Sequence, residues 1–374
     1  MTIRFFATAF LWLTLLQFLS ARNAQAAAAP SNLIQAKKEA EAKGFSFIAS
    51  RDEIVAAAKK EGKVRVLTAL QSETYKPMID SFKKKYPFID AEIQELTGAD
   101  AFQRFALELN AGSVKDWDIV HATDDFYLEL AAHARKIDIL AMAEHKVLRI
   151  NPKMIDPELR SVIAVASAAG VIAYNKNLIA PDRVPNSLED FLKPEFKGRK
   201  FLVDIRPHWM ASLIPGLGKE PVLEYARKLK DQQPVWASGQ TSGLVSINNG
   251  EYPMYHLVNY HSCVRVLRRD TKQSLTCKVI EPVPVRFQES GMVIKTAPRP
   301  HAALLFLEHE TSPEGQKVID EFGPVKSHLY AGGEINKIIQ GKQISLNDYR
   351  TYRNSPEWMK MVVEAYGFPR ADKK

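Results

Sequence analysis

The sequence predicts an α/β protein built from two lobes. Strand-like apolar runs alternate with helix-like segments along much of the chain, which is typical of parallel βαβ units. Removing a leader of 26 residues from the total of 374 leaves 348, more than one compact core of ordinary size holds. Two apolar runs, at residues 162–173 and 291–295, separate two series of such units. We interpret them as the chain crossing from one lobe to the other and back.

The first 26 residues have the pattern of a secretory signal peptide. Arg4 supplies a basic start, residues 10–19 are mostly apolar, and Ala24-Gln25-Ala26 is a small-x-small cleavage site. The apolar core is shorter than the roughly 18 residues that a membrane span needs. We expect cleavage near Ala26 and export to the periplasm without a lipid anchor, because no cysteine lies near that site.

The elements of the first lobe follow the leader in order. Two segments rich in Ala, Lys and Glu read as surface helices and make residues 27–63 an N-terminal helical extension. In the expected helix at 75–86, Pro77 is tolerated because it lies in the first turn, and Pro87 ends the helix. The expected elements are helices at 31–43 and 51–61, then strand 64–70, helix 75–86, strand 91–96, helix 101–111 and strand 118–121.

A second series of elements follows the first apolar run. It predicts strand 200–204, helix 221–230, a helix near 244–249, strand 254–258 and strand 277–282, before the second run and helix 300–309. The expected division is lobe 1 at 64–165 and 291–374 and lobe 2 at 166–290.

Ligands of parallel α/β sheets bind beyond the carboxyl ends of the strands. Three loops of the first lobe occupy that position and form its expected ligand wall. Their candidate residues are Ser72 and Glu73, Thr97 and Gly98, and Thr123 and Asp124.

Two segments of the second lobe are candidates for binding an anion. Arg206 follows a predicted strand, and its planar guanidinium suits a carboxylate or phosphate, although a structural ion pair is an equal alternative. Thr241 and Ser242 lie at a probable helix start, where free N–H groups bind anions. The alternative there is an ordinary N-cap by one of these two residues.

The composition narrows the class of protein. Loss of Arg4 and Arg22 with the leader lowers the net charge from +8 to +6, a mild excess that favours anionic ligands. No block of five or six like charges appears, which argues against nucleic acid as a partner. Gly239-Gln240-Thr241-Ser242-Gly243 misses the nucleophile elbow by one position, and Gly218-Lys219 lacks the Ser or Thr of a P-loop. We therefore expect no enzyme.

The two cysteines, Cys263 and Cys277, have thirteen residues between them. In an oxidising compartment such a pair favours a disulfide, which would contribute roughly 3 kcal/mol by the chain-entropy estimate. Two buried free thiols are the alternative.

Several short segments, weak alone, resemble in order and spacing the extracellular solute-binding proteins of ABC importers, in particular the ferric-ion-binding group. They are 82–87 (FKKKYP), 118–120 (DIV), 174–176 (YNK), 188–198 (LEDFLKPEFKG), 250–253 (GEYP), 300–303 (PHAA) and 312–316 (SPEGQ). The resemblance covers roughly residues 55–325. It implies a type II periplasmic binding protein fold with two crossover strands as the hinge, a monomer that delivers its solute to an inner-membrane permease.

The ligand stays open at this point. Ferric relatives commonly use two adjacent tyrosines, whereas this chain has Asn259-Tyr260-His261 at the matching place. Tyr260 and His261 are candidate iron ligands. The alternative is that both hydrogen-bond an organic ligand or simply pack, and Asn259 is a further candidate for the ligand site. Fe(III) as cargo and a small organic anion are therefore both retained. The alternatives to a transport protein are a secreted hydrolase with an unrecognised site and a sensor subunit.

Overall fold

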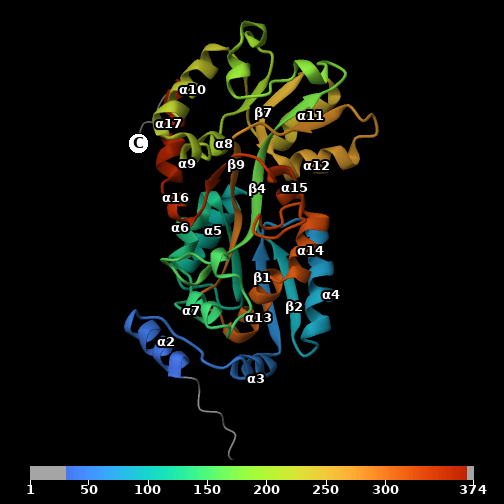
Figure 1. The fold of residues 1–374 in the computed structure, drawn as a ribbon. Helices are drawn as coiled ribbons and strands as arrows, with labels where there is room; N and C mark the ends of the chain where they lie inside the picture. Colours follow the sequence, from blue (N-terminus) through green and yellow to red (C-terminus); the bar gives the residue numbers. More distant parts are fainter. Residues whose placement is uncertain (1–30, 369–374) are drawn as a thin grey trace, which may run out of the picture.

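The structure, a computed structural model, describes residues 31–368 and has the two-lobed α/β fold that the sequence predicts (Figure 1). The predicted leader and its cleavage near Ala26 lie outside the described residues. The ten described strands form one sheet in the order β2-β1-β3-β9-β4-β7-β5-β6, with β10 pairing with β9 and β8 with β4.

Lobe 1 is built on parallel βαβ units. β1 (Lys63–Thr68) pairs in parallel with β2 (Asp90–Glu95) and with β3 (Ile119–Thr123). α4 (Tyr75–Lys85) and α5 (Ala99–Asn110) connect these strands. Further helices of this lobe are α2 (Ser31–Ala42), α3 (Arg51–Glu61), α6 (Tyr127–Ala131), α7 (Ile139–Glu144), α13 (Pro300–Glu310) and α14 (Pro313–Phe322).

Lobe 2 places the short strand β5 (Leu202–Asp204) between β6 (Val235–Ala237) and β7 (Met254–Asn259), parallel to both. Its helices cover the two faces of these strands (Figure 1). They are α8 (His208–Ala211), α9 (Ile214–Leu217), α10 (Lys219–Asp231), α11 (Gln240–Asn249) and α12 (Tyr260–Arg269), and β8 (Leu275–Lys278) pairs with the crossing strand β4.

Two long antiparallel strands, β4 (Val162–Asn175) and β9 (Val283–Val293), pass through both lobes (Figure 1). Every residue of β4 is buried, and its first part packs in the lobe 1 core while its last part packs in lobe 2. The first predicted crossing is therefore present. The second begins at Val283 rather than at Gly291, because β9 starts with alternating apolar and polar residues that do not read as an apolar run.

The C-terminal region returns to lobe 2. After α15 (Glu334–Ile339), β10 (Ile344–Asn347) and α16 (Tyr349–Tyr352), the helix α17 (Ser355–Ala365) lies beside α10 (Figure 1). Val362 and Tyr366 are buried in the lobe 2 core, whereas the predicted boundary put all of 291–374 in lobe 1. Burial of this apolar helix face against α10 and α8 is the physical reason for the difference.

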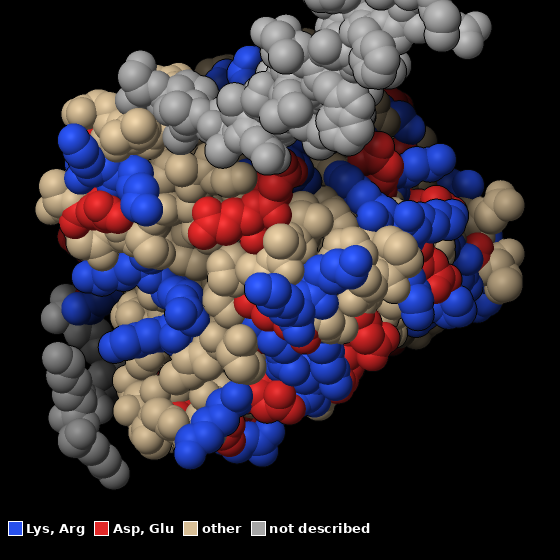
Figure 2. Space-filling model, turned by 90° about the horizontal axis from the view of Figure 1, so that it is seen from below, with Lys and Arg blue, Asp and Glu red and all other residues tan. Residues whose placement is uncertain are grey.

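The face of lobe 1 that Figure 2 shows carries basic and acidic side chains mixed together, and is not covered by charges of one sign. None of the helices that the structure describes is long and apolar enough to cross a membrane.

Candidate functional site

A cavity of about 440 Å³ lies between the two lobes. Its lobe 1 wall follows the carboxyl ends of β1, β2 and β3, in agreement with the rule for parallel sheets. Its lining residues are Ala69, Thr97, Gly98, Ala99, Phe102, Thr123, Asp125 and Phe126 from lobe 1, Arg206, His208, Gln240, Asn259 and Arg265 from lobe 2, and Arg286 and Gln288 from β9.

The start of α5 brings backbone N–H groups to this cavity. Gly98 is the N-cap residue, with φ 84° and ψ 144°, and no side chain caps the helix. The first N–H groups of a helix have no partner within the helix and carry partial positive charge. Beside them Phe102 and Phe126 stack with ring centroids 4.8 Å apart and planes inclined by 11°. The lobe 1 wall thus offers N–H donors next to an aromatic surface.

Arg206 lies on the lobe 2 wall, just after β5. Its backbone N–H donates to Asp204 Oδ1 (3.0 Å), and its guanidinium lies 3.4 Å from Asp204 Oδ2. The side chain remains 53% exposed, so it forms a loose local ion pair and still faces the cavity. The structural ion pair that the sequence left as an alternative is present, while binding of an anion by Arg206 stays a prediction.

Arg265 reaches the cavity from α12. One of its five N–H donors goes to Ser262 Oγ (3.0 Å). Burial, and then the charge of Arg269, lowers the pKa of Arg265. The surroundings of the Arg265 guanidinium therefore disfavour its positive charge, and an anion bound beside it would stabilise that charge.

Arg286 approaches from the crossing strand β9. Its side chain is buried, at 4% exposure, and its guanidinium lies over the ring of Trp209, 4.8 Å from the centroid. Burial lowers the pKa of Arg286 to about 10, so it stays charged at neutral pH. The described lining thus has three guanidinium groups against the single carboxylate of Asp125.

Gln240 brings an amide side chain to the lobe 2 side of the cavity. Gln240, the first residue of α11, accepts a hydrogen bond at Oε1 from the backbone N–H of Asn259 (2.7 Å). This bond fixes the helix start against the end of β7. Because the Gln240 oxygen accepts this bond, its NH₂ group is the part of the amide that can donate to a ligand. A ligand with several acceptor oxygens, such as an anion, would suit this donor.

Several predicted residues are not brought into this cavity. Thr241 lines a neighbouring cavity of about 320 Å³, together with Gln71, Arg265 and Arg269. Neither Thr241 nor Ser242 is the N-cap of α11, because Gly239 occupies that position with a φ of 97°, which glycine adopts without strain.

Ser72 and Glu73, in the loop after β1, do not line this cavity, although Ala69 of the same loop does. Ser72 donates to its neighbour Glu73 (3.3 Å). A backbone hydrogen bond, with smaller contributions from Arg269 and Arg265, lowers the pKa of Glu73. Asp124 begins the short helical turn after β3, and the structure does not describe its side chain.

Tyr260 and His261 lie at the start of α12 but do not line the cavity. The Tyr260 hydroxyl donates to Glu334 Oε2 on α15 (3.1 Å), and burial raises its pKa to about 12, which disfavours a phenolate. His261 is buried, and burial lowers its pKa to about 3. Within residues 31–368 no group of three or more His, Cys, Asp or Glu is placed to hold a metal ion.

The predicted disulfide between Cys263 and Cys277 is present, with the Cα atoms 6.5 Å apart. It ties α12 to β8, and through β8 to the crossing strand β4. The helix that carries Arg265 is therefore fixed to the lobe 2 sheet by a covalent bond.

Several lining residues were not predicted from the sequence: Asp125, His208, Arg265, Arg286 and Gln288. Val285, Arg286, Phe287 and Gln288 alternate apolar and polar side chains, which is a strand signal and would have placed Arg286 and Gln288 on one face. Arg265 gives no such signal, because it is one of three arginines on the same helix.

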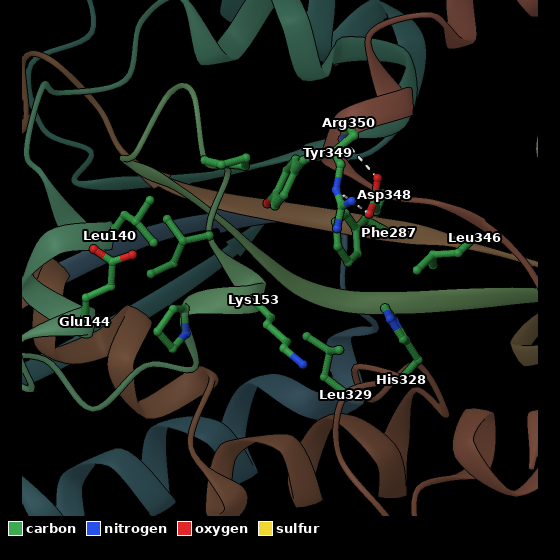
Figure 3. A pocket seen from close by; sticks show the side chains of 13 residues that line it. Leu140, Glu144, Lys153, Phe287, His328, Leu329, Leu346, Asp348, Tyr349 and Arg350 are labelled. Carbon is green, nitrogen blue, oxygen red and sulfur yellow. Dashed lines mark hydrogen bonds and ion pairs between the residues drawn. The ribbon is translucent and has the colours of Figure 1, made fainter. Parts of the chain in front are cut away.

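A larger cavity, of about 540 Å³, is lined by Phe287 (Figure 3). Because side chains alternate along β9, Phe287 points to the opposite face of the strand from Arg286 and Gln288. Figure 3 shows Leu140, Leu346 and Tyr349 around it and the ion pair between Asp348 and Arg350 (3.5 Å). The lining is mainly apolar, with two basic and two acidic residues besides His328. It offers no excess of positive charge, so the smaller cavity between the lobes is the candidate solute site.

Two lobes joined by crossing strands around a polar cavity define a solute-binding protein of the type II fold. A family model described as bacterial extracellular solute-binding protein matches residues 77–337, more than half of the chain. The chain belongs to this family, whose members are non-enzymatic components of ABC import. No curated protein matches the chain.

Solved structures of ferric-binding proteins share the fold. A Trichodesmium protein (IdiA, FutA) in complex with iron and citrate is 20% identical, with a TM-score of 0.64 over 81% of this chain and 99% of that one. Iron-bound HitA from Pseudomonas aeruginosa is 16% identical, with a TM-score of 0.60 and coverage of 81% and 99%. The Mannheimia haemolytica ferric iron-binding protein A in an open conformation is 19% identical, with a TM-score of 0.62 and coverage of 82% and 100%.

Proposed function

We propose that this protein is the periplasmic solute-binding component of an ABC importer and that it binds a small organic anion between its lobes. One observation carries the proposal: guanidinium groups from three separate elements, Arg206, Arg265 and Arg286, line the cavity together with the uncapped start of α5. A guanidinium is suited to bidentate binding of carboxylates and phosphates. The lobes would close on the solute about β4 and β9, and the closed monomer would dock on its permease.

The proposal is tested by calorimetric titration and thermal unfolding with citrate as the probe. Citrate should raise the melting temperature, because a ligand of the native state stabilises it by mass action. Arg206→Ala should weaken citrate binding by about 1.5–3 kcal/mol, as expected for a lost charged hydrogen bond. Arg268→Ala, on α12 but outside the lining, is the matched control. If no carboxylate or phosphate binds at all, the anion proposal fails.

Ferric iron is the second candidate cargo, because several solved structures that share the fold are iron-bound or ferric-binding proteins. Iron held by the Tyr260 phenolate should give a visible charge-transfer colour that disappears in Tyr260→Phe. Iron binding would require the Tyr260 hydroxyl to break its hydrogen bond to Glu334 and to lose its proton. The Tyr260 pKa of about 12 disfavours that loss at neutral pH. The present contacts therefore favour the organic anion.

A further inference from the structure

The larger cavity, of about 540 Å³, lies on the face of β9 that points away from the site between the lobes. Its volume is within the range of about 300–1,000 Å³ that is usual for small-molecule sites. The lining comes from residues 140–157, from β9 and from residues 328–350 (Figure 3). Eight of the thirteen lining residues are apolar or aromatic, so the cavity is suited to a molecule with an apolar body.

Three rings form part of this lining. Phe287 and Tyr349 have ring centroids 4.7 Å apart, and the imidazole of His328 lies 5.9 Å from the Phe287 ring. Aromatic rings favour offset-stacked or edge-to-face contacts with a further ring. An aromatic ligand would therefore gain more here than an aliphatic one.

His328 supplies a hydrogen-bond donor within the apolar lining. Its Nδ1 is 2.9 Å from Ser167 Oγ on the crossing strand β4, and this Oγ also accepts the backbone N–H of His328 (3.2 Å). Among the described residues, Nδ1 is the acceptor that the buried Ser167 hydroxyl reaches, so we assign the ring proton to Nε2. No described residue accepts a hydrogen bond from Nε2, which stays accessible to solvent. Burial lowers the pKa of His328 to about 4, although Asp348 acts in the opposite direction, so the ring is neutral at neutral pH.

The charged residues of this lining balance one another. Lys153 and Arg350 are matched by Glu144 and Asp348, and Arg350 pairs with Asp348 (3.5 Å). The cavity between the lobes differs, because its lining has three arginines and one aspartate. The larger cavity therefore favours an uncharged ligand.

We propose that this cavity is a second binding site, which takes an uncharged aromatic molecule with one hydrogen-bond acceptor, such as an aryl ketone. The ring packs against Phe287 and Tyr349, and the acceptor binds the Nε2–H of His328. Both crossing strands take part, β9 through Phe287 and β4 through the Ser167 that orients His328. The site is separate from the solute site and does not depend on the solute being an anion.

The test uses prodan, an uncharged naphthyl ketone whose fluorescence shifts to the blue in apolar surroundings. We expect saturable binding of one prodan per protein with such a shift. Leu329→Trp should weaken binding by roughly tenfold or more, because the larger side chain takes up part of the cavity. Leu178→Trp makes the same change at an exposed leucine outside the lining and should leave prodan binding unchanged.

The acceptor is tested by a variant and by a second probe. His328→Phe keeps a ring but removes the donor, and should weaken prodan binding by roughly 2–10-fold, as for a lost neutral hydrogen bond. N,N-dimethyl-2-naphthylamine lacks the ketone, so it should bind the parent protein more weakly than prodan and lose nothing in His328→Phe. If circular dichroism shows that His328→Phe is not folded, the comparison of the two probes in the parent protein decides.

The rival site for an aromatic probe is the stack of Phe102 and Phe126 between the lobes. Thr97→Trp fills that cavity and should leave prodan binding unchanged. A loss of binding in Thr97→Trp but not in Leu329→Trp would place prodan between the lobes and overturn the proposal. Absence of saturable binding, or equal affinities of the parent protein for the two probes, would overturn it as well. None of these outcomes bears on whether an anion binds between the lobes.

Discussion

Asp125 Oδ1 and His208 Nε2 lie 3.4 Å apart and connect the two lobes beside the cavity between them. Asp125 belongs to the turn after β3 in lobe 1, and His208 starts α8 in lobe 2. Burial lowers the pKa of His208, although Asp125 acts in the opposite direction. At neutral pH the contact therefore joins a neutral imidazole and a carboxylate rather than two full charges.

Asp125→Ala should widen the cleft of the protein without ligand. Removing the carboxylate deletes a direct contact between the lobes, so small-angle scattering should show a larger radius of gyration. The free energy of unfolding should change by less than about 1 kcal/mol, because Asp125 is 45% exposed. Asp80→Ala, which removes a surface pair with Lys76 in lobe 1, is the control. An unchanged radius in Asp125→Ala would show that this contact does not hold the lobes together.

His121→Ala should destabilise the protein strongly. His121 is fully buried, with Nδ1 2.8 Å from Thr68 Oγ1 and 3.3 Å from Glu289 Oε2, and Nε2 3.1 Å from Glu310 Oε2. Removing the imidazole leaves two buried carboxylates without their cation, which costs roughly 3–5 kcal/mol. Urea unfolding measures this loss, and a change below about 1 kcal/mol would mean that the carboxylates are neutral or find other partners.

The same cluster predicts a loss of stability at alkaline pH. Burial alone would lower the pKa of His121, but Glu310 and Glu289 outweigh it and raise the pKa to about 10. Its folded pKa lies above the unfolded value of about 6.5, so its contribution is complete below pH 6.5 and is lost as the pH rises through 10. The melting temperature should fall over this range, and the fall should be much smaller in His121→Gln. If the melting temperature falls equally with pH in the parent protein and in His121→Gln, His121 is not the cause of the fall.

Removing the disulfide should cost about 3 kcal/mol of folding stability, as estimated for a loop of this length. The double variant Cys263→Ser, Cys277→Ser avoids a free thiol, and guanidinium unfolding with and without reductant gives the comparison. Reductant should lower the stability of the parent protein to that of the variant. Citrate binding should weaken too, because α12 positions Arg265.

Gly98→Ala should reduce both stability and anion affinity. The backbone at Gly98, with φ 84° and ψ 144°, is costly for any residue with a Cβ, by roughly 1–3 kcal/mol. Relaxation of that strain would move the first N–H groups of α5 away from the cavity. Gly112→Ala is the matched control, since Gly112 has φ 66° with no atom within 4 Å of an added Cβ and lies at the far end of α5. It should lose stability and retain citrate binding.

The sequence predicted the lobe 1 elements up to β3, and α13, to within about two residues, because their periodicity and turn residues agree with one another. It did not predict α6, α7 or α14. It could not place α17, whose packing on lobe 2 depends on contacts distant along the chain. For the site, Thr97, Gly98 and Thr123 follow from the strand-end rule, and Arg206 and Asn259 also line the cavity. Arg265 and Arg286 do not follow from it, since nothing local distinguishes an arginine facing a cleft from one facing solvent.

The packing of α17 has a mechanical consequence. Besides β4 and β9, the chain passes between the lobes a third time, between Tyr352 in the lobe 1 core and Val362 in the lobe 2 core. Three connections resist twisting of one lobe on the other more than two do, and leave bending as the easiest relative motion. Closure of the lobes would then follow one direction of bending, set by the packing of the C-terminal helix.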